Sequence, residues 1–251
     1  MRTHNCLSRD NLAIMSVEIH GTVSEGWEPV HERFVSNFDS LGELGASVCI
    51  TFEGETVVDL WAGESDTLGN PWAEDTIAVV NSCTKGAVAL ACHLLADRGL
   101  LDLDAPVSEV WPEFAHGAKA SITTRMMLNH TTGVAAFRED LPQGAAFDWD
   151  YMCDRIAAEE PWWPPGTRNG YHLMSFGWVA GELVRRASGK SLGTFFKEDV
   201  ANPVGADFWI GLPSEEHHRV SALQPFRPGA DEKFSAFTQA FLADPDGLQG
   251  R

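Results

Sequence analysis

The sequence predicts an α+β fold, and three observations support this prediction. Two apolar, β-branched segments near the N-terminus flank a short turn, as in a hairpin, and apolar residues recur at helical spacing in several segments after residue 81. The chain has 251 residues, of which 44% are hydrophobic and 10% aromatic. Such a chain can bury enough apolar surface to form a core, which excludes wholesale disorder.

The elements of the sheet region come first along the chain. Apolar residues recur at helical spacing over residues 29–38, which predicts an amphipathic helix. Residues 46–52 and 56–61 are rich in β-branched and apolar side chains, and Glu53-Gly54-Glu55 between them is typical of an antiparallel turn. Two strands alone are marginal, so the hairpin needs further strands or covering helices.

The remainder of the chain is predicted to be mainly helical. A helix begins at Ser82 and stops before Gly99, and a short helix follows Thr123 or Thr124 as its cap. Three prolines and two glycines make the segment PWWPPGTRNGY an irregular loop. Helices are also predicted for 172–187, ending before a glycine, and for 192–200, capped by a serine.

Charge and cysteine usage limit the partners and the compartment. The net charge of −18 is spread along the chain and repels phosphate backbones and anionic lipids, so neither nucleic acid nor membrane is expected as a partner. The five cysteines form no C-x-x-C pair, which predicts neither a disulfide framework nor a zinc site. With no secretory signal and no long apolar run, a cytoplasmic location is expected. Residues 1–19 are predicted to be a disordered leader, with the true start open between Met1 and Met15.

A nucleophile and a base are spaced for catalysis in Asn81-Ser82-Cys83-Thr84-Lys85, at the start of a predicted helix. Residues three apart share one helical face, so the Lys85 amine can reach the Ser82 hydroxyl. The positive end of the helix dipole favours a neutral amine and stabilises a developing oxyanion. The S-x-x-K spacing is common by chance, but its position at a strand-to-helix junction strengthens it.

Tyr171 is a further candidate because it follows the rigid proline-glycine loop and is predicted to open a helix. An unperturbed phenol titrates near pH 10, so it acts as a base only where a cation such as protonated Lys85 stabilises the phenolate. Ser82, Lys85 and Tyr171 therefore form a self-consistent catalytic set.

The chain resembles the β-lactamase-related serine hydrolases, the penicillin-binding-protein-like group that includes cytoplasmic carboxylesterases. The resemblance extends from about His20 to Asp231 through ordered motifs: VVDLWAG, SCTK, LLADRGLLDLDAPVSEVWPEF, MMLNHTTGV, PPGTRNGYH, GWVAGELVRRASGKSLGTFF and NPVGADFWIG. It implies that an antiparallel sheet is flanked by helices, with a partial serine-hydrolase domain over residues 20–251. Residues 20–80 would form the helix and hairpin, and residues 81–251 the mainly helical part.

The resemblance also implies the chemistry. Ser82 matches the acylated nucleophile, Lys85 its lysine and Tyr171 the general-base tyrosine. The activity expected is hydrolysis of small esters through an acyl-serine intermediate, with no metal and no organic cofactor. Abundant tryptophan is more similar to the esterase branch than to the lactamases.

Two departures from the family pattern leave alternatives open. Leu173 stands where lactamases have the asparagine of Y-x-N, which weakens a β-lactamase or peptidase reading. The third family motif, a K-T-G, H-x-G or W-x-G triplet beyond Tyr171, is not found, because neither Trp61-Ala62-Gly63 nor Trp209-Ile210-Gly211 lies at the expected place. The chain is therefore expected to be truncated, without its C-terminal strands. The main alternative is a catalytically impaired family member with a binding role or none.

Other residues have weaker signals. His172, Trp162 and Trp163 are candidates for substrate binding beside Tyr171, with core packing as the alternative. His130 is expected to have a structural role at a helix end. His217-His218 with Glu215-Glu216 is expected to be a solvated loop and not a metal site. The oligomeric state is open, although an exposed hairpin edge predicts association.

Overall fold

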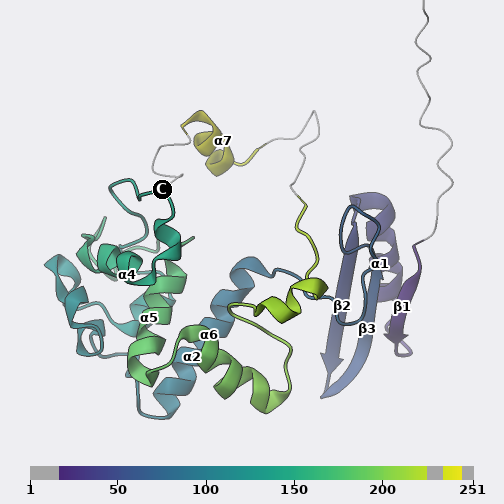
Figure 1. Cartoon of the computed structure of the whole chain (residues 1–251), viewed down its shortest axis with the longest axis horizontal. Helices are drawn as coiled ribbons and strands as arrows, with labels where there is room; N and C mark the ends of the chain where they lie inside the picture. Colours follow the sequence, from purple (N-terminus) through teal and green to yellow (C-terminus); the bar gives the residue numbers. More distant parts are fainter. Residues whose placement is uncertain (1–16, 225–233, 245–251) are drawn as a thin grey trace, which may run out of the picture. The chain divides into compact units, whose positions relative to one another are not determined.

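The computed structural model describes residues 17–224 and 234–244, and these belong to two units (Figure 1). The first unit contains residues up to 79 together with 213–227. The second contains residues 80–212 and the segment from 228 onward. The first is built around a sheet and the second around helices, as the α+β prediction requires.

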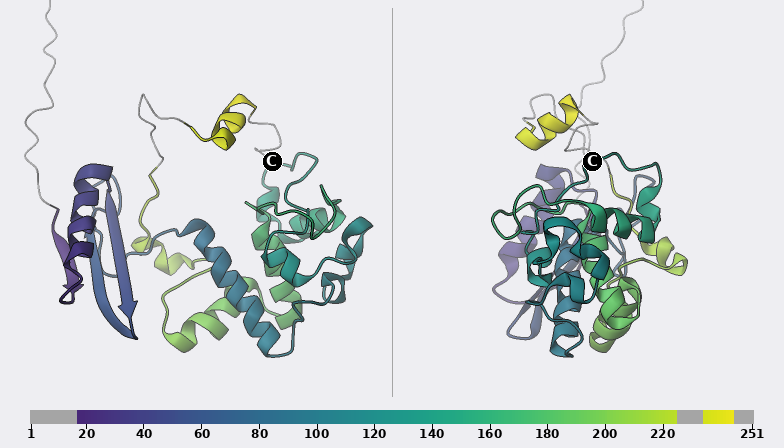
Figure 2. Two further views of the ribbon diagram at one scale, coloured as in Figure 1. Left: turned by 180° about the vertical axis from the view of Figure 1, so that it is seen from behind. Right: turned by 90° about the vertical axis from the view of Figure 1, so that its left-hand side faces the viewer.

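The first unit is a three-stranded antiparallel sheet with strand order β1-β3-β2 and the helix α1 (Glu28–Leu41) beside it (Figures 1 and 2). Strands β2 (Gly45–Phe52) and β3 (Glu55–Gly63) form the predicted hairpin. Glu53 and Gly54 both have positive φ, 51° and 88°, which gives the turn the twist that the flanking strands need. The predicted helix and hairpin are therefore confirmed.

The core of this unit lies between α1 and β3. Alternate residues of β3, Val58, Leu60 and Ala62, are at most 2% exposed and cluster with Phe34 of α1. This alternation is typical of a strand with one buried face. Burying each of the larger side chains stabilises the fold by about 1.5–3 kcal/mol.

Strand β1 (Ile19–Val23) was not predicted. It pairs with β3 from Ile19 opposite Ala62 to Val23 opposite Val58, and Val17 packs against the core of this unit, so residues 17–19 of the expected leader belong to the folded unit. Residues 1–16 lie outside the described part of the chain. The strand is five residues long and contains Gly21, which weakens its signal. The glycine is required because a Cβ there would lie 1.9 Å from the Asp59 carbonyl oxygen.

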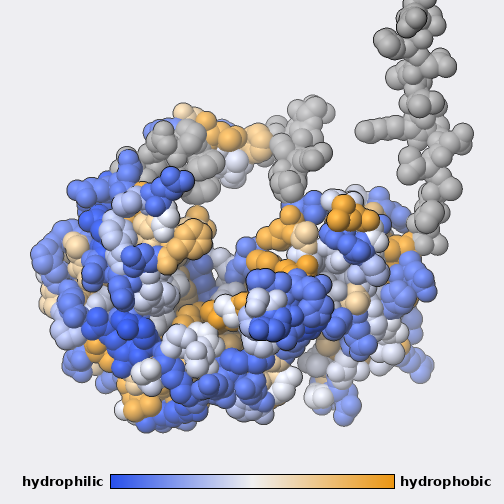
Figure 3. Space-filling view, in the orientation of Figure 1, coloured by the Kyte–Doolittle hydropathy of each residue, from blue (hydrophilic) through white to orange (hydrophobic). Residues whose placement is uncertain are grey.

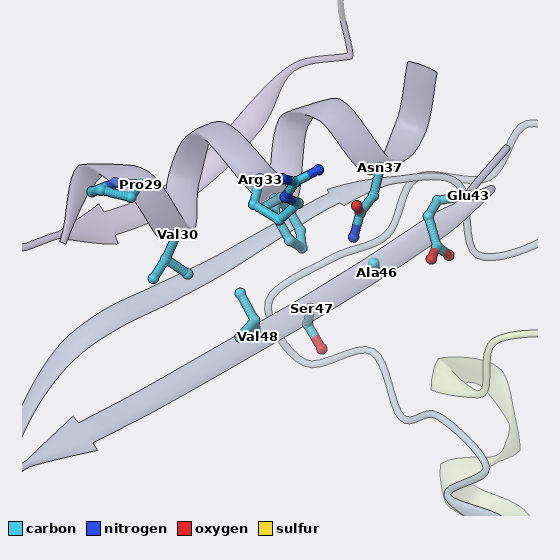
Figure 4. Close-up of a pocket in the computed structure, with 9 residues that line it drawn as sticks. Pro29, Val30, Arg33, Asn37, Glu43, Ala46, Ser47 and Val48 are labelled. Carbon is cyan, nitrogen blue, oxygen red and sulfur yellow. The ribbon is translucent and has the colours of Figure 1, made fainter. Parts of the chain in front are cut away.

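A groove of about 510 Å³ lies between α1 and β2 (Figure 4). Val30 and Phe34 of α1 and Ala46 and Val48 of β2 give it an apolar lining. Within residues 17–224 and 234–244, β2 pairs only with β3, so its other edge has no strand beside it. This is the exposed hairpin edge that the sequence predicts.

The second unit is centred on the contact between α2 (Thr84–Asp97) and α5 (Phe176–Ser188). Their packed faces form one buried cluster, which includes Val88, Ala91, Cys92 and Leu95 of α2 with Phe176, Ala180 and Val184 of α5. Gly99 follows α2 with a φ of 68°, the left-handed conformation common after helix ends. The predicted helix and its stop are confirmed.

A second cluster joins the short helix α3 (Thr124–Leu128), capped by Thr123, to α4 (Trp149–Ala158). Its buried members include Trp111, Phe114, Met127, Met152 and Ile156. The sequence offered Thr123 or Thr124 as the cap, and the structure selects Thr123, whose hydroxyl accepts the Met126 N–H at 3.2 Å. Helix α4, capped by Asp148, was not predicted as a separate element.

The helix predicted from residue 192 follows its predicted cap. Ser191 caps α6 (Leu192–Phe195), which continues as a π-helix over Phe196–Ala201. Helix α7 (Ala236–Ala243), capped by Ser235, was not predicted. On the face shown in Figure 3, hydrophilic side chains cover most of the coloured surface and hydrophobic ones form smaller patches. Of the helices in the described residues, none is long and apolar enough to cross a membrane.

Glu182 forms a buried charged cluster on α5. Its carboxylate is fully buried and accepts hydrogen bonds from Arg185 and Arg186 at 2.7 Å and from the Trp149 ring N–H at 2.8 Å. Burial by itself raises the pKa of this carboxyl, but the bonds from Arg185, Trp149 and Arg186 outweigh burial and lower the pKa to about 2. Glu182 is therefore a paired, ionised group within the helical unit.

Candidate active site

Ser82 lies in a 3₁₀ turn, Asn81–Cys83, that leads directly into α2. Asn81 has a φ of 45°, a left-handed conformation that asparagine tolerates better than most residues. The turn leaves the Ser82 side chain exposed at the first turn of the helix. Backbone N–H groups at this end lack intrahelical acceptors and favour negative charge.

Lys85 reaches Ser82 as its spacing predicts. The Lys85 Nζ donates to Ser82 Oγ at 3.0 Å and to the Leu173 carbonyl oxygen at 3.2 Å. The second bond ties α2 to the segment that follows Tyr171. The ammonium is thereby held between the serine hydroxyl and that segment, within the distance needed for proton transfer.

Tyr171 joins the pair from a distant part of the sequence. Its ring centroid lies 4.8 Å from Lys85 Nζ, and its side chain is exposed. Hydrogen bonds with Ser82 and then with Lys85 lower the pKa of the phenol below its ordinary value. The structure therefore brings all three predicted catalytic residues together.

The expected helix start at Tyr171 was wrong, because α5 begins at Phe176. The backbone groups between them bond elsewhere: the His172 N–H donates to His130 Nδ1, and the Leu173 carbonyl accepts from Lys85. These tertiary hydrogen bonds replace the ones that a helical turn would make. Tyr171 is thus presented by an irregular segment.

A cleft of about 500 Å³ opens beside the serine and lysine. Its other walls are mainly apolar, and they include Leu173, Met174, Phe176, Leu192 and Ile210. Lys85 is the only charged side chain among the described residues that line it. Such a cleft accepts a small, uncharged, largely apolar group next to the hydroxyl.

The three residues expected to bind substrate do not line this cleft. His172 is only 1% exposed and faces Thr132 and His130. The Trp162 ring N–H donates to the Ala136 carbonyl at 2.9 Å. All three lie outside this cleft, and a role for them in binding substrate stays a prediction.

Trp163 supports the segment before Tyr171. Its ring N–H donates to the Arg168 carbonyl at 3.1 Å, and a Cβ at Gly170 would lie 2.3 Å from its ring. The tryptophan ring therefore packs against the end of the proline-glycine loop. These contacts help to hold the backbone in place immediately before Tyr171. The sequence had indicated only that the loop is rigid.

His130 is the site residue that sequence reasoning missed. It follows α3 with a φ of 65°, which agrees with the predicted helix-ending role, but its ring also lies 4.8 Å from the Tyr171 ring. The two are 41 positions apart, and no local pattern connects them. The available sequence signal was a histidine just after a predicted helix end, where glycine is usual, and its left-handed backbone is visible only in the structure.

The adjacent residues His217 and His218 belong to no cluster of metal-ligating side chains in the part of the chain that the structure describes. His217 and His218 lie on the short 3₁₀ segment Ser214–Arg219, where His218 Nδ1 contacts the Glu215 carbonyl oxygen at 2.7 Å. In the ranges 17–224 and 234–244, no group of three or more His, Cys, Asp or Glu residues is placed to hold a metal ion.

Comparison with known proteins gives the family. A family model described as Beta-lactamase matches residues 31–238. Esterase/beta-lactamase LipL of Mycobacterium tuberculosis is 35% identical over 197 residues, covering 78% of this chain and 46% of that protein. Esterase EstB of Burkholderia gladioli is 32% identical over 210 residues, covering 75% of this chain and 52% of that protein.

Solved structures agree. The crystal structure of a family VIII carboxylesterase matches with a TM-score of 0.79 and 44% identity, covering 83% of this chain and 58% of that one. A penicillin-binding protein homologue from Caulobacter crescentus matches with a TM-score of 0.81 and 40% identity, covering 87% of this chain and 58% of that one. The chain spans about half the length of the two esterases named above. By the extent of the family match and the shared fold, the chain belongs to the beta-lactamase family.

Proposed function

We propose that this chain holds the nucleophilic centre of a carboxylesterase that cleaves small esters through an acyl-serine intermediate. The observation that carries the proposal is the 3.0 Å hydrogen bond from Lys85 to the Ser82 hydroxyl, with the Tyr171 ring beside both. Similarity to proteins named as esterases supports the same chemistry.

The reaction follows from the roles of these groups. Ser82 Oγ attacks the ester carbonyl, and its proton passes to the Tyr171 oxygen, whose phenolate form Lys85 stabilises. The Ser82 backbone N–H, in the turn that leads into α2, stabilises the tetrahedral oxyanion by donating a hydrogen bond to it. The carbon–oxygen bond to the alcohol then breaks, and the alcohol leaves with the proton. Water, deprotonated by the same base, releases the acid and restores the serine.

Ester chemistry is favoured over lactam chemistry by the cleft. Leu173, at the third position of Y-x-N, is 51% exposed and lines the cleft, where its side chain makes no hydrogen bond to a substrate amide. The apolar wall suits short, uncharged acyl groups. No metal or organic cofactor takes part in the proposed steps, and a cytoplasmic location is part of the same proposal.

Substrate comparison tests the proposed activity. We expect the chain to hydrolyse p-nitrophenyl acetate and butyrate with a kcat/KM at least about 100-fold above that for a chromogenic cephalosporin, because the site lacks an amide-binding group. Release of p-nitrophenol and opening of the cephalosporin are followed under the same conditions. A faster reaction with the cephalosporin would support the lactamase alternative, and no hydrolysis of either by the folded chain would support the catalytically impaired one.

A further inference from the structure

Two histidines lie within hydrogen-bonding distance of each other beneath the Tyr171 ring. The Nδ1 atoms of His130 and His172 are 2.9 Å apart, although the residues are 42 positions apart in the sequence. The His130 ring is also 4.8 Å from the Tyr171 ring and 5.3 Å from that of Phe176. The pair therefore links α3, the tyrosine segment and the start of α5.

The hydrogen bonds around the pair define a neutral state. The His172 backbone N–H donates to His130 Nδ1 at 3.2 Å, so that nitrogen bears a lone pair. His172 Nδ1 must then donate its proton across the 2.9 Å contact. Its Nε2 is consequently an acceptor for the Thr132 hydroxyl at 2.9 Å, and that hydroxyl accepts the Val134 N–H at 3.0 Å.

A proton added to His130 has no suitable place, because its Nδ1 already faces two donors. A proton on His172 Nε2 would require the Thr132 hydroxyl to turn from donor to acceptor, and a backbone hydrogen bond with Val134 offsets only part of the effect of burial. Within the described residues, the charged or titratable side chains that face the pair are Lys85 on α2 and the Tyr171 phenol. Both histidines therefore favour the neutral form.

The backbone of His130 also supports the tyrosine segment. Its φ of 65° is unusual for a residue with a side chain, and glycine fits such a position with less strain. Its carbonyl accepts the Gly170 N–H at 2.9 Å, immediately before Tyr171. The His130 side chain adds a ring contact with Tyr171 and an acceptor for the His172 N–H. Glycine would make the same turn without these two interactions.

We propose that the two histidines, as a neutral pair, position the Tyr171 phenol beside the nucleophile, and that a proton taken up by either ring releases it. The proposal rests on the proposed function of Ser82 as the acylated residue. The histidines are positioning residues, because they act through Tyr171 and do not line the cleft.

The pH dependence has a definite sign. Burial, and then Lys85, lowers the pKa of His130 below 6.5, while burial followed by His130 and Lys85 lowers the pKa of His172 to about 4. A base with a lowered pKa contributes stability that is complete above its ordinary pKa and declines as the pH falls. The assembled centre should therefore persist at pH 7 and open as the pH falls from about 6.5 towards 4.

Variants of His130 separate positioning from simple packing. Asparagine tolerates the left-handed backbone, and its Oδ1 can replace Nδ1 as an acceptor without taking up a proton. We expect His130→Ala to slow labelling of Ser82 by a fluorophosphonate about 10- to 100-fold at pH 7. His130→Asn should be labelled at most of the wild-type rate at pH 7, and its labelling rate should decline less than that of wild type as the pH falls. The control is His93→Asn, an exposed histidine on α2, which should change neither.

A second readout does not depend on activity. Tyr151 and Tyr171 are the two tyrosines of the chain, so ¹³C-tyrosine NMR in a Tyr151→Phe background follows Tyr171 alone. We expect its lowered pKa to move towards the ordinary value in His130→Ala but not in His130→Asn. Imidazole ¹⁵N shifts should place one proton on His172 Nδ1 and one on His130 Nε2.

The outcomes distinguish the two proposals. If Ser82 is labelled but the pH profile and the Tyr171 titration are unchanged in both His130 variants, the positioning role is wrong. A proton found on His172 Nε2 would also overturn it. If the NMR results hold while no label reaches Ser82, the histidine pair stands and the proposed nucleophile fails.

Discussion

Replacing Ser82 with alanine is expected to abolish ester hydrolysis, with kcat/KM for p-nitrophenyl butyrate falling at least about 10³-fold. The Ser82 hydroxyl accepts a hydrogen bond from Lys85 Nζ at 3.0 Å, and among the described residues no other serine lines the cleft. Because Ser82 is exposed, the free energy of unfolding should change by less than about 0.5 kcal/mol. Loss of activity would therefore report lost chemistry.

The matched control for this variant is Cys83→Ala. Cys83 is an exposed free cysteine adjacent to Ser82, and thiols react with activated esters. Its removal should leave turnover within about twofold, since the thiol is not among the residues that line the cleft. Loss of turnover in Cys83→Ala with retention in Ser82→Ala would assign the reaction to the thiol and contradict the proposal.

Replacing Glu182 with alanine is expected to have the largest effect on stability, lowering the free energy of unfolding by about 3 kcal/mol. The variant leaves Arg185 and Arg186 without their buried partner and the Trp149 ring N–H without its acceptor. Urea unfolding at pH 7 measures the change. Glu182→Gln, which retains a carbonyl acceptor but no charge, should lose about half as much.

The control and the pH dependence make this prediction specific. Glu198→Ala breaks an exposed pair with Lys190 and should cost less than about 1 kcal/mol. Since the pKa of Glu182 is lowered to about 2, its contribution is complete above about pH 4.5 and is lost as the pH falls towards 2. The difference between wild type and Glu182→Ala should shrink over that range. A difference that stays constant with pH would contradict the charge-based explanation.

Local signals in the sequence were sufficient for much of the fold. Glu53-Gly54 identified the hairpin turn, and Gly99 the end of α2. The start of α3 was placed at Thr123 or Thr124. Each of these residues acts through backbone conformation or a nearby N–H group. The five-residue β1 and the ten-residue α4 were missed. Strand β1 depends on pairing with β3 and contains a glycine, so its own residues indicate little.

The candidate site was predictable only in part, because some of its contacts join segments that are distant in the sequence. Ser82 and Lys85 lie one helical turn apart, so their contact follows from local geometry. Tyr171 was predicted as a site residue from its position after the rigid loop and from the resemblance to the family. The contact between His130 and His172 depends on tertiary packing of segments 42 positions apart, which no local pattern specifies. The burial of His172 could not be predicted from the sequence, because it depends on this tertiary contact.

The central claim, that Ser82 is the nucleophile of this centre, is tested most directly by intact-mass spectrometry after incubation with a fluorophosphonate. We expect the mass of one probe to be added per chain, peptide mapping to place it on Ser82, and the Ser82→Ala variant to remain unlabelled. A folded wild-type chain that takes up no probe, or a Ser82→Ala variant that is labelled as fast as wild type, would contradict the account.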